Sequence, residues 1–194
     1  MIPWKIYLMN LELMKKGTNI KGDYVECGVW KGGMTAGASE IFGKNRRYYL
    51  FDSFEGLPPA QEIDGEGAIE WQKNTDSPNY YDNCTASEND ARKAMEKSPA
   101  KDVQIVKGWF DQTLSQFPKE RKIACLRLDA DWYESTWICF EELYDSVAQG
   151  GLIIIDDYKS WDGCAKAVHD FLSSKKNADR LYQFNNSVSY ILKH

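Results

Sequence analysis

Four aspartates follow two apolar segments of the chain, at the points where buried strands would end. Asp129 and Asp131 come after one segment, and Asp156 and Asp157 come after the next. Consecutive parallel strands joined by one helix usually lie side by side, about 4.8 Å apart, so the four carboxylates would converge at one sheet edge. Such a group of like charges is unfavourable unless a cation neutralises it. Oxygen-only ligands predict a hard divalent cation, Mg²⁺ or else Ca²⁺ or Mn²⁺; helix caps and solvated turn acids are the alternative.

A glycine-containing turn follows the first apolar segment and reads Glu26-Cys-Gly-Val-Trp-Lys-Gly-Gly33. Glycine lets the backbone approach a ligand closely and lets the next helix begin beside it. Asp52 ends the second apolar segment, about 20–25 residues beyond the turn, where a carboxylate can bind two ribose hydroxyls. The turn lacks GxGxxG spacing, so a structural glycine turn and an N-cap aspartate remain alternatives. Together the turn and the acid favour an adenosine-containing cofactor.

Short apolar runs alternate with helical patterns along most of the chain. Continuous hydrophobic runs are typical of buried parallel strands, and apolar residues spaced by three or four indicate helices. The alternation predicts an open α/β sheet with helices on both faces. The two segments that flank Asn185-Asn186 predict a terminal hairpin with at least one antiparallel strand. The predicted strands are 24–29, 48–52, 103–106, 123–128, 152–155, 181–184 and 187–192, and the predicted helices are 3–16, 32–43, 87–97, 110–117, 136–149 and 162–174.

Residues 55–86 interrupt this alternation. The segment is rich in Gly, Pro, Asp and Asn, with Trp71, Tyr80 and Tyr81 interspersed. A structureless insertion longer than about 15 residues in a compact domain is usually disordered or a functional lid. The aromatic residues favour a lid. We therefore expect one domain over residues 1–194, with an N-terminal helix within 1–20 and a lid over 55–86.

Composition excludes several classes of protein. The 24 Lys and Arg residues stand against 29 Asp and Glu residues, a net charge of -5, whereas non-specific nucleic-acid binding needs a basic face. No apolar run approaches the roughly 20 residues that span a bilayer. The N-terminal residues lack the apolar core of a signal peptide. We therefore expect a cytoplasmic protein that binds neither nucleic acid nor membrane.

Four motifs resemble, in the same order, those of the macrocin O-methyltransferase family. They are Glu26-Cys-Gly-Val-Trp-Lys-Gly-Gly, Phe51-Asp-Ser-Phe-Glu-Gly-Leu-Pro58, Leu126-Arg-Leu-Asp-Ala-Asp-Trp-Tyr-Glu-Ser-Thr136 and Gly150-Gly-Leu-Ile-Ile-Ile-Asp-Asp-Tyr158. The likeness extends from about residue 20 to residue 172. It implies the Rossmann-like fold of class I methyltransferases that use S-adenosylmethionine (SAM), with sheet order 3-2-1-4-5-7-6 and the last strand antiparallel. It also implies SAM and Mg²⁺ as cofactors.

The resemblance also implies roles for individual residues. Asp129, Asp156 and Asp157 match the metal ligands, and Asp131 matches the proposed general base. Trp109 follows the third strand and is a candidate wall for the adenine ring, with packing in the core as the alternative. Family members usually have more chain before the first strand than is present here, in a region that contributes to the lid and to dimer contacts. The predicted cofactor-binding residues are Glu26, Gly28, Thr35, Asp52, Ser53, Gly108, Trp109 and Asp129.

These observations predict a SAM-dependent, divalent-metal-dependent O-methyltransferase that acts on a small hydroxylated molecule, first of all a sugar or glycoside. A metal beside the acceptor hydroxyl would lower the pKa of that hydroxyl, and a carboxylate would accept the proton. The alternatives are a methyltransferase for another diol or catechol-like acceptor and an Asp-rich metal-dependent hydrolase of related fold. An NAD oxidoreductase is disfavoured by the glycine spacing. A homodimer is compatible with the resemblance.

Overall fold

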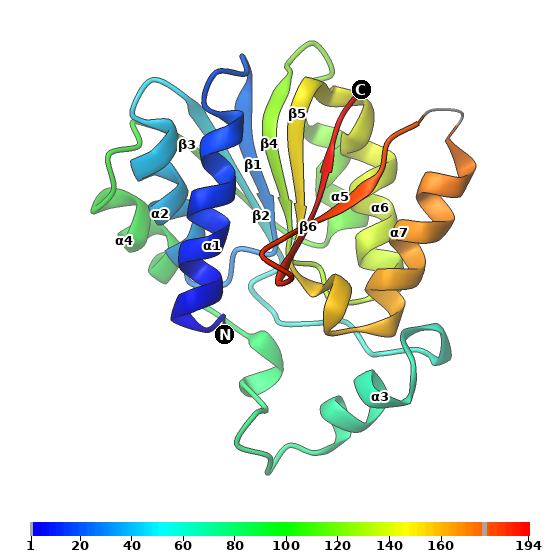
Figure 1. Ribbon diagram of the computed structural model, residues 1–194. Helices are drawn as coiled ribbons and strands as arrows, with labels where there is room; N and C mark the ends of the chain where they lie inside the picture. The colour runs from blue at the N-terminus through cyan, green and yellow to red at the C-terminus, as the bar shows by residue number, and fades with distance from the viewer. Residues whose placement is uncertain (1, 176–177) are drawn as a thin grey trace.

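A computed structural model describes residues 2–175 and 178–194 (Figure 1), and in this part of the chain seven strands form one mixed sheet. The strand order is β3-β2-β1-β4-β5-β7-β6. The strands are β1 (Asp23–Cys27), β2 (Arg47–Asp52), β3 (Asp102–Lys107), β4 (Ile123–Leu128), β5 (Val147–Ile155), β6 (Leu181–Phe184) and β7 (Val188–Leu192). The helices are α1 (Trp4–Met14), α2 (Gly33–Phe42), α3 (Glu66–Lys73), α4 (Glu88–Glu96), α5 (Phe110–Thr113), α6 (Tyr133–Leu143) and α7 (Asp162–Ser174).

The pairing of the strands confirms the predicted topology. β1 pairs in parallel with β2 and β4, and β4 pairs in parallel with β5. β7 is antiparallel to both β5 and β6, as expected for the last strand. Asn185 and Asn186 turn the terminal hairpin with φ values of 49° and 53°, a conformation that Asn tolerates better than most residues. The order is that of the class I SAM-dependent methyltransferases.

Helices cover both faces of the sheet, with α1, α2 and α4 on one side and α5, α6 and α7 on the other (Figure 1). Successive strand residues point to opposite faces, so Cys125 packs with the first layer and Leu126 with the second. Both β1 and β4 are buried along their whole length. Ligands can therefore reach the central strands only at their ends. None of the described helices is both long and apolar enough to cross a membrane.

The predicted helix over 136–149 is wrong at both ends. α6 begins earlier and stops at Leu143, a 3-10 turn follows, and residues 147–151 belong to β5. Val147 pairs with Ile123 of β4 and is buried, so strand pairing overrides the helical pattern there. The predicted helix over 110–117 is also shorter in the structure: α5 ends at Thr113 and continues only as a 3-10 turn.

Residues 55–86 contain regular structure that their composition did not predict. α3 and two short 3-10 helices lie in this segment, which hangs below the carboxyl ends of the strands (Figure 1). The helix α3 begins after Gly65 and buries Ala68. Because most of its other residues are polar, its apolar pattern is too narrow to be recognised in the sequence. The segment is thus ordered into short helices, while its action as a lid stays a prediction; the name lid is kept below for residues 55–86.

Hydrogen bonds dock the base of this lid onto the domain. The Asp64 carboxylate accepts a bond of 2.7 Å from the backbone N–H of Tyr133, at the start of α6. The indole N–H of Trp132 donates to the carbonyl of Pro58 over 2.9 Å. By contrast, residues 73–76 at the outer end of the lid are exposed.

Gly28 lies where the chain after β1 passes close to the chain after β4. Its φ is +85°, and a Cβ there would lie 1.8 Å from the carbonyl oxygen of Asp129. The neighbouring backbone bond, from Asp129 N–H to the carbonyl of Cys27, is 2.9 Å long. A side chain at position 28 would therefore push apart the two strand ends.

We expect Gly28→Ala to destabilise the protein by about 2–3 kcal/mol, because of both the contact and the positive φ. Gly33→Ala is the matched control, since Gly33 opens α2 and a Cβ there would meet no atom within 4 Å. Urea unfolding of the two variants measures the difference. Equal free energies of unfolding would contradict the proposed close approach.

We expect the amides of residues 57–86 to exchange quickly with solvent in the free protein, most of all toward the exposed outer end. Adding cofactor together with acceptor should slow this exchange, because lids of this kind close over their ligands. Hydrogen–deuterium exchange of the free and liganded protein measures the effect. Strong and equal protection in both states would make the segment a static part of the fold.

Candidate active site

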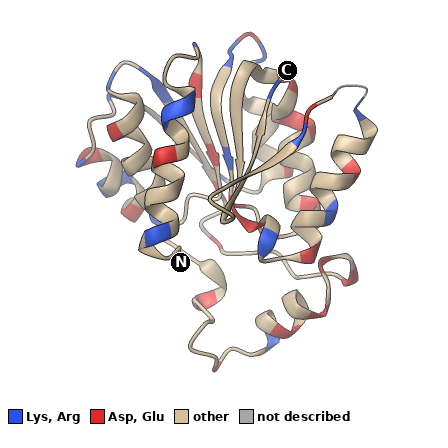
Figure 2. Ribbon diagram, viewed as in Figure 1, with Lys and Arg blue, Asp and Glu red and all other residues tan. Residues whose placement is uncertain are grey.

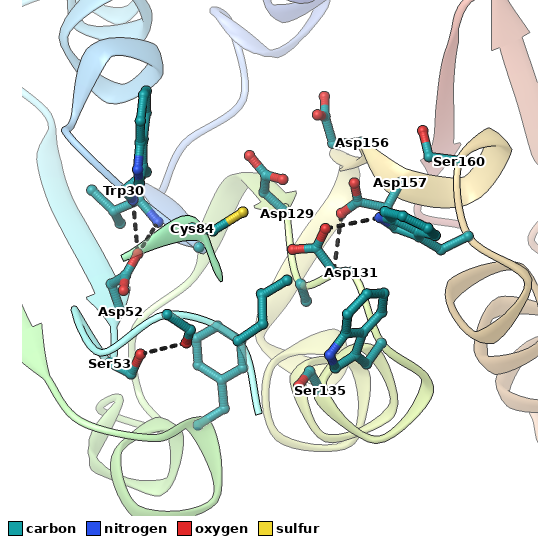
Figure 3. Close-up of a pocket in the computed structure, with 18 of the residues that line it drawn as sticks. Trp30, Asp52, Ser53, Cys84, Asp129, Asp131, Ser135, Asp156, Asp157 and Ser160 are labelled. Carbon is teal, nitrogen blue, oxygen red and sulfur yellow. Dashed lines mark hydrogen bonds between the residues drawn. The ribbon is translucent and has the colours of Figure 1, made fainter. Parts of the chain in front are cut away.

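One large cavity lies at the carboxyl ends of β1, β2, β4 and β5, above the lid. Its volume is about 1170 Å³, and its walls come from the turns after these strands, from α1 and from the lid. In Figure 3 Asp52 and the turn at Trp30 lie on one side, and Asp129, Asp131, Asp156 and Asp157 lie together on the other. The predicted cofactor turn and the predicted metal site therefore share one cavity.

Asp52 fixes the glycine-containing turn. One of its carboxylate oxygens accepts bonds of 2.7 Å from the backbone N–H groups of Val29 and Trp30, and the other accepts from Phe54 over 2.6 Å. These bonds hold Trp30 and Phe54 in the left-handed region, at φ values of 48° and 56°. Burial raises the pKa of Asp52 and the three N–H donors oppose that shift. A ribose ligand would have to share oxygens that already hold the turn, so this role stays a prediction.

Glu26 lies at the inner wall of the same cavity and is 1% exposed. The hydroxyls of Thr35 and Tyr24 both donate to the same carboxylate oxygen, Oε2, and the bond from Tyr24 is 3.3 Å long. Burial raises the pKa of Glu26 to about 7, although Arg127 and Thr35 oppose the shift. Thr35 itself is fully buried and does not line the cavity. It can therefore affect a ligand only indirectly, through its hydrogen bond to Glu26.

The remaining predicted cofactor residues all line the cavity. Ser53 is held by a hydrogen bond to the carbonyl of Gly56, 3.0 Å long. Gly108 donates its N–H to the carbonyl of Asp52 over 2.9 Å, which brings the turn after β3 beside the turn after β2. Trp109 follows it at the start of α5. The structure thus brings together every predicted cofactor residue except Thr35 at one surface.

Asp129, Asp156 and Asp157 offer one oxygen each within 4.8 Å of one another. Burial is the main cause that raises the pKa of Asp156 and of Asp157, and the neighbouring carboxylates raise both further. Three converging carboxylates are the hard oxygen donors that Mg²⁺ prefers, and a small set leaves coordination positions for an acceptor. The donor set therefore fits a divalent cation.

Asp131 lies two residues beyond Asp129, and its carboxylate is bound by Trp161. Its φ is 56°, so the backbone turns sharply after β4. The indole N–H of Trp161 donates to its carboxylate over 2.9 Å, while its own N–H donates to Asp157 over 3.1 Å. Burial and then Asp129 raise the pKa of Asp131 to about 7. A carboxylate with such a pKa is well matched to accept a proton near neutral pH.

Tryptophans form much of the cavity wall. Six of the seven in the chain line it. Trp71 of the lid, Trp132 and Trp161 meet edge to face, with ring centroids 5.1–6.3 Å apart. Each of these three indole N–H groups already donates to the protein, to Asn79, Pro58 and Asp131. The aromatic wall, defined here as these three tryptophans, therefore presents apolar rings to a ligand.

Four residues of the site were not predicted from the sequence. Arg127 was part of a motif, but nothing in its spacing showed that it would contact carboxylates of three strands. Trp161 follows β5 at a distance that gave no sign of its bond to Asp131. Ile6 and Tyr7 of α1 also line the cavity, although their spacing predicted only a packed helix face.

Comparison with known proteins identifies the family. Residues 11–193 match the family described as macrocin-O-methyltransferase (TylF). The chain belongs to the macrocin O-methyltransferase family. This membership makes it an O-methyltransferase of the SAM-dependent class, as the motifs predicted.

Two curated relatives of the chain are from streptomycetes. Demethyldecarbamoylnovobiocin O-methyltransferase from Streptomyces niveus is 32% identical over 180 residues, which are 90% of this chain and 67% of the relative. The 8-demethyl-8-(2,3-dimethoxy-alpha-L-rhamnosyl)-tetracenomycin-C 4'-O-methyltransferase from Streptomyces olivaceus is 35% identical over 159 residues, 78% of this chain and 58% of the relative. The chain thus spans about three fifths to two thirds of these relatives' length.

A solved structure shows the same fold. The O-methyltransferase NovP superimposes with a TM-score of 0.77 at 29% sequence identity, covering 96% of this chain and 80% of NovP. The match extends over the strands whose ends build the cavity, because it covers nearly the whole chain.

Replacing Trp161 with Phe removes the hydrogen bond to Asp131 and keeps an aromatic ring. We expect turnover to fall about fivefold, the effect of losing roughly one hydrogen bond. Without this donor the charged carboxylate is less stable, so the acidic limb of the pH–rate profile should move to higher pH. Trp4→Phe, on an exposed residue outside the cavity, is the control. An unchanged acidic limb would mean that Trp161 does not act on the base.

Proposed function

We propose that this protein transfers the methyl group of SAM to a hydroxyl of a sugar or glycoside, with the help of a divalent cation and with Asp131 as general base. One observation carries the proposal. A single cavity places Asp131 beside the three carboxylates of Asp129, Asp156 and Asp157 and opposite the turn that Asp52 holds.

The residues of this chain divide the work. Asp129, Asp156 and Asp157 would hold the cation, which when bound supplies the positive charge that lowers the pKa of an acceptor hydroxyl. Asp131 would accept the hydroxyl proton while the acceptor oxygen forms its bond to the methyl carbon. The carbon–sulfur bond breaks in the same step, and its electron pair stays on sulfur, which gives S-adenosylhomocysteine. The turn after β1 would orient the methyl donor in line with the attacking oxygen.

The cavity favours an uncharged acceptor with an apolar part. Ten Asp and Glu side chains line it against three Lys and Arg side chains in the described part of the chain. Residues 55–86 contain seven acids, one of which, Asp64, is among these ten, and one lysine; the acids are the red positions on the tan lid in Figure 2. An anionic nucleotide sugar would meet this negative field. A neutral glycoside could instead place its sugar at Asp131 and its aglycone on the aromatic wall.

The relatives support an acceptor of this kind. By its name, the enzyme from Streptomyces olivaceus acts on a tetracenomycin C that carries a rhamnosyl group, and the enzyme from Streptomyces niveus acts on demethyldecarbamoylnovobiocin. A screen of neutral aryl glycosides against catechols and dTDP-sugars separates the proposal from a catechol methyltransferase. Methylation of catechols alone would favour that second candidate.

Replacing Asp131 with Asn keeps the shape of the side chain and removes its basicity. We expect SAM and Mg²⁺ to bind almost normally while turnover falls by about 10²–10⁴, the usual range for losing a general base. Calorimetry measures the two affinities, and methyl transfer from labelled SAM measures turnover. EDTA should abolish the activity of the wild-type protein, and Mg²⁺ should restore it.

Asp145→Asn is the matched control, because Asp145 is exposed and pairs with Lys175, and neither residue lines the cavity. Its turnover should stay within about twofold of wild type. A fully active Asp131→Asn variant would remove Asp131 from the role of base. Activity that persists in EDTA would remove the cation from the proposal and leave the methyl-transfer part standing.

A further inference from the structure

A buried arginine joins the two halves of the site. Arg127 of β4 is 1% exposed and lies between β1 and β5. One terminal nitrogen, Nη1, is 2.8 Å from both Glu26 and Asp129, and the other, Nη2, is 2.8 Å from Asp156. Its Nε has no hydrogen-bond partner. The guanidinium thus forms ion pairs with carboxylates from three neighbouring strands.

The sheet explains why these groups meet. Glu26 and Arg127 are direct partners in the β1–β4 pairing, and Arg127 is the partner of Ile154 in the β4–β5 pairing. Asp129 lies two residues beyond Arg127, and Asp156 lies two residues beyond Ile154. Side chains two residues apart in a strand point to the same face, so both aspartates lie on the face of Arg127. The fold therefore places the guanidinium of Arg127 between Glu26, on the proposed SAM side, and Asp129 and Asp156, on the proposed metal side.

Arg127 uses one oxygen of Asp129 and one oxygen of Asp156. A carboxylate has a second oxygen, so each of these aspartates can contact the guanidinium and a metal ion together. Asp157 is not among the ion-pair partners that the structure shows for Arg127, and it completes the set of three. Arg127 therefore puts a permanent positive charge beside the carboxylates that would bind the divalent cation.

We propose that Arg127 is a built-in counter-ion and positioning residue: it holds the cation ligands together before the ion arrives, weakens the binding of the ion, and fixes Glu26 for SAM. This inference rests on the proposed function for the identity of the two ligands. The guanidinium repels a divalent ion at close range, which keeps the ion exchangeable. It also provides the only cationic partner that the structure shows for the buried carboxylate of Glu26.

The two effects have opposite signs, which separates this role from a merely structural one. Loss of the charge in Arg127→Gln should tighten Mg²⁺ binding by about tenfold or more, because the repulsion disappears. The same change should weaken SAM binding by about tenfold, because Glu26 keeps only hydroxyl donors. A variant that is simply misfolded would bind both ligands less well.

Calorimetry on metal-stripped protein, with Mg²⁺ alone and with SAM alone, tests the proposal. Arg127→Lys keeps the charge and should bind Mg²⁺ within about threefold of wild type. Arg121→Gln is the matched control, since Arg121 pairs with Asp23 at the other end of the same two strands. Both of its affinities should stay within about twofold of wild type.

Weaker binding of both ligands by Arg127→Gln, or no change in either affinity, would overturn the proposal. So would an Arg127→Lys variant that binds Mg²⁺ about tenfold more tightly than wild type, because this variant keeps the charge. If Arg127→Gln unfolds when stripped of metal, Mg²⁺ should raise its melting temperature more than it raises that of wild type, and an equal or smaller rise would contradict the counter-ion role.

The experiment also separates this inference from the proposed function. If the wild-type protein binds no Mg²⁺ and Arg127→Gln gains such binding, the counter-ion role stands while the cation part of the proposed function fails. If neither protein binds Mg²⁺, both fail.

Discussion

The structure depends on the convergence of like charges at one edge of the sheet. Parallel pairing of β1, β4 and β5 brings Glu26, Asp129, Asp156 and Asp157 to the same end of the domain, where burial raises the cost of each charge. Arg127 compensates part of this charge from within the sheet. The remaining negative charge is the physical reason for proposing a divalent cation and a cationic cofactor as ligands of this site. Binding chemistry and fold stability therefore involve the same carboxylates.

Backbone geometry at the strand ends follows from the same constraint. Trp30, Phe54 and Asp131 have positive φ, and each lies in a turn that directs side chains or N–H groups toward the cavity. Such conformations persist only where surrounding contacts compensate for their strain. Asp52 supplies these contacts for the first two residues, and Asp157 and Trp161 supply them for Asp131. The acids of this edge thus shape the turns as well as the ligand surface.

The sequence was sufficient for the features that depend on strand ends. Aspartates after apolar runs predicted that Asp129, Asp131, Asp156 and Asp157 would converge, as they do in the cavity, because parallel strands share an edge whatever their side chains. The choice of Asp129, Asp156 and Asp157 as cation ligands came from the family resemblance. Two kinds of feature could not be predicted. The strand at 147–151 and the helix α3 depend on tertiary packing, which overrides local pattern. Arg127 and Trp161 depend on contacts between distant segments that no spacing within one segment encodes.

The central claim is that one cavity binds the methyl donor and a divalent cation side by side, with Asp129, Asp156 and Asp157 as the ligands of the cation. A crystal structure of the protein grown with S-adenosylhomocysteine and Mn²⁺ tests it most directly, because anomalous scattering locates manganese without reference to the expected site. The account predicts a single strong anomalous peak among these three carboxylates, with the homocysteine moiety beside Glu26 and the turn at Gly28. Bound S-adenosylhomocysteine with no manganese peak there, or with the peak elsewhere, would contradict it.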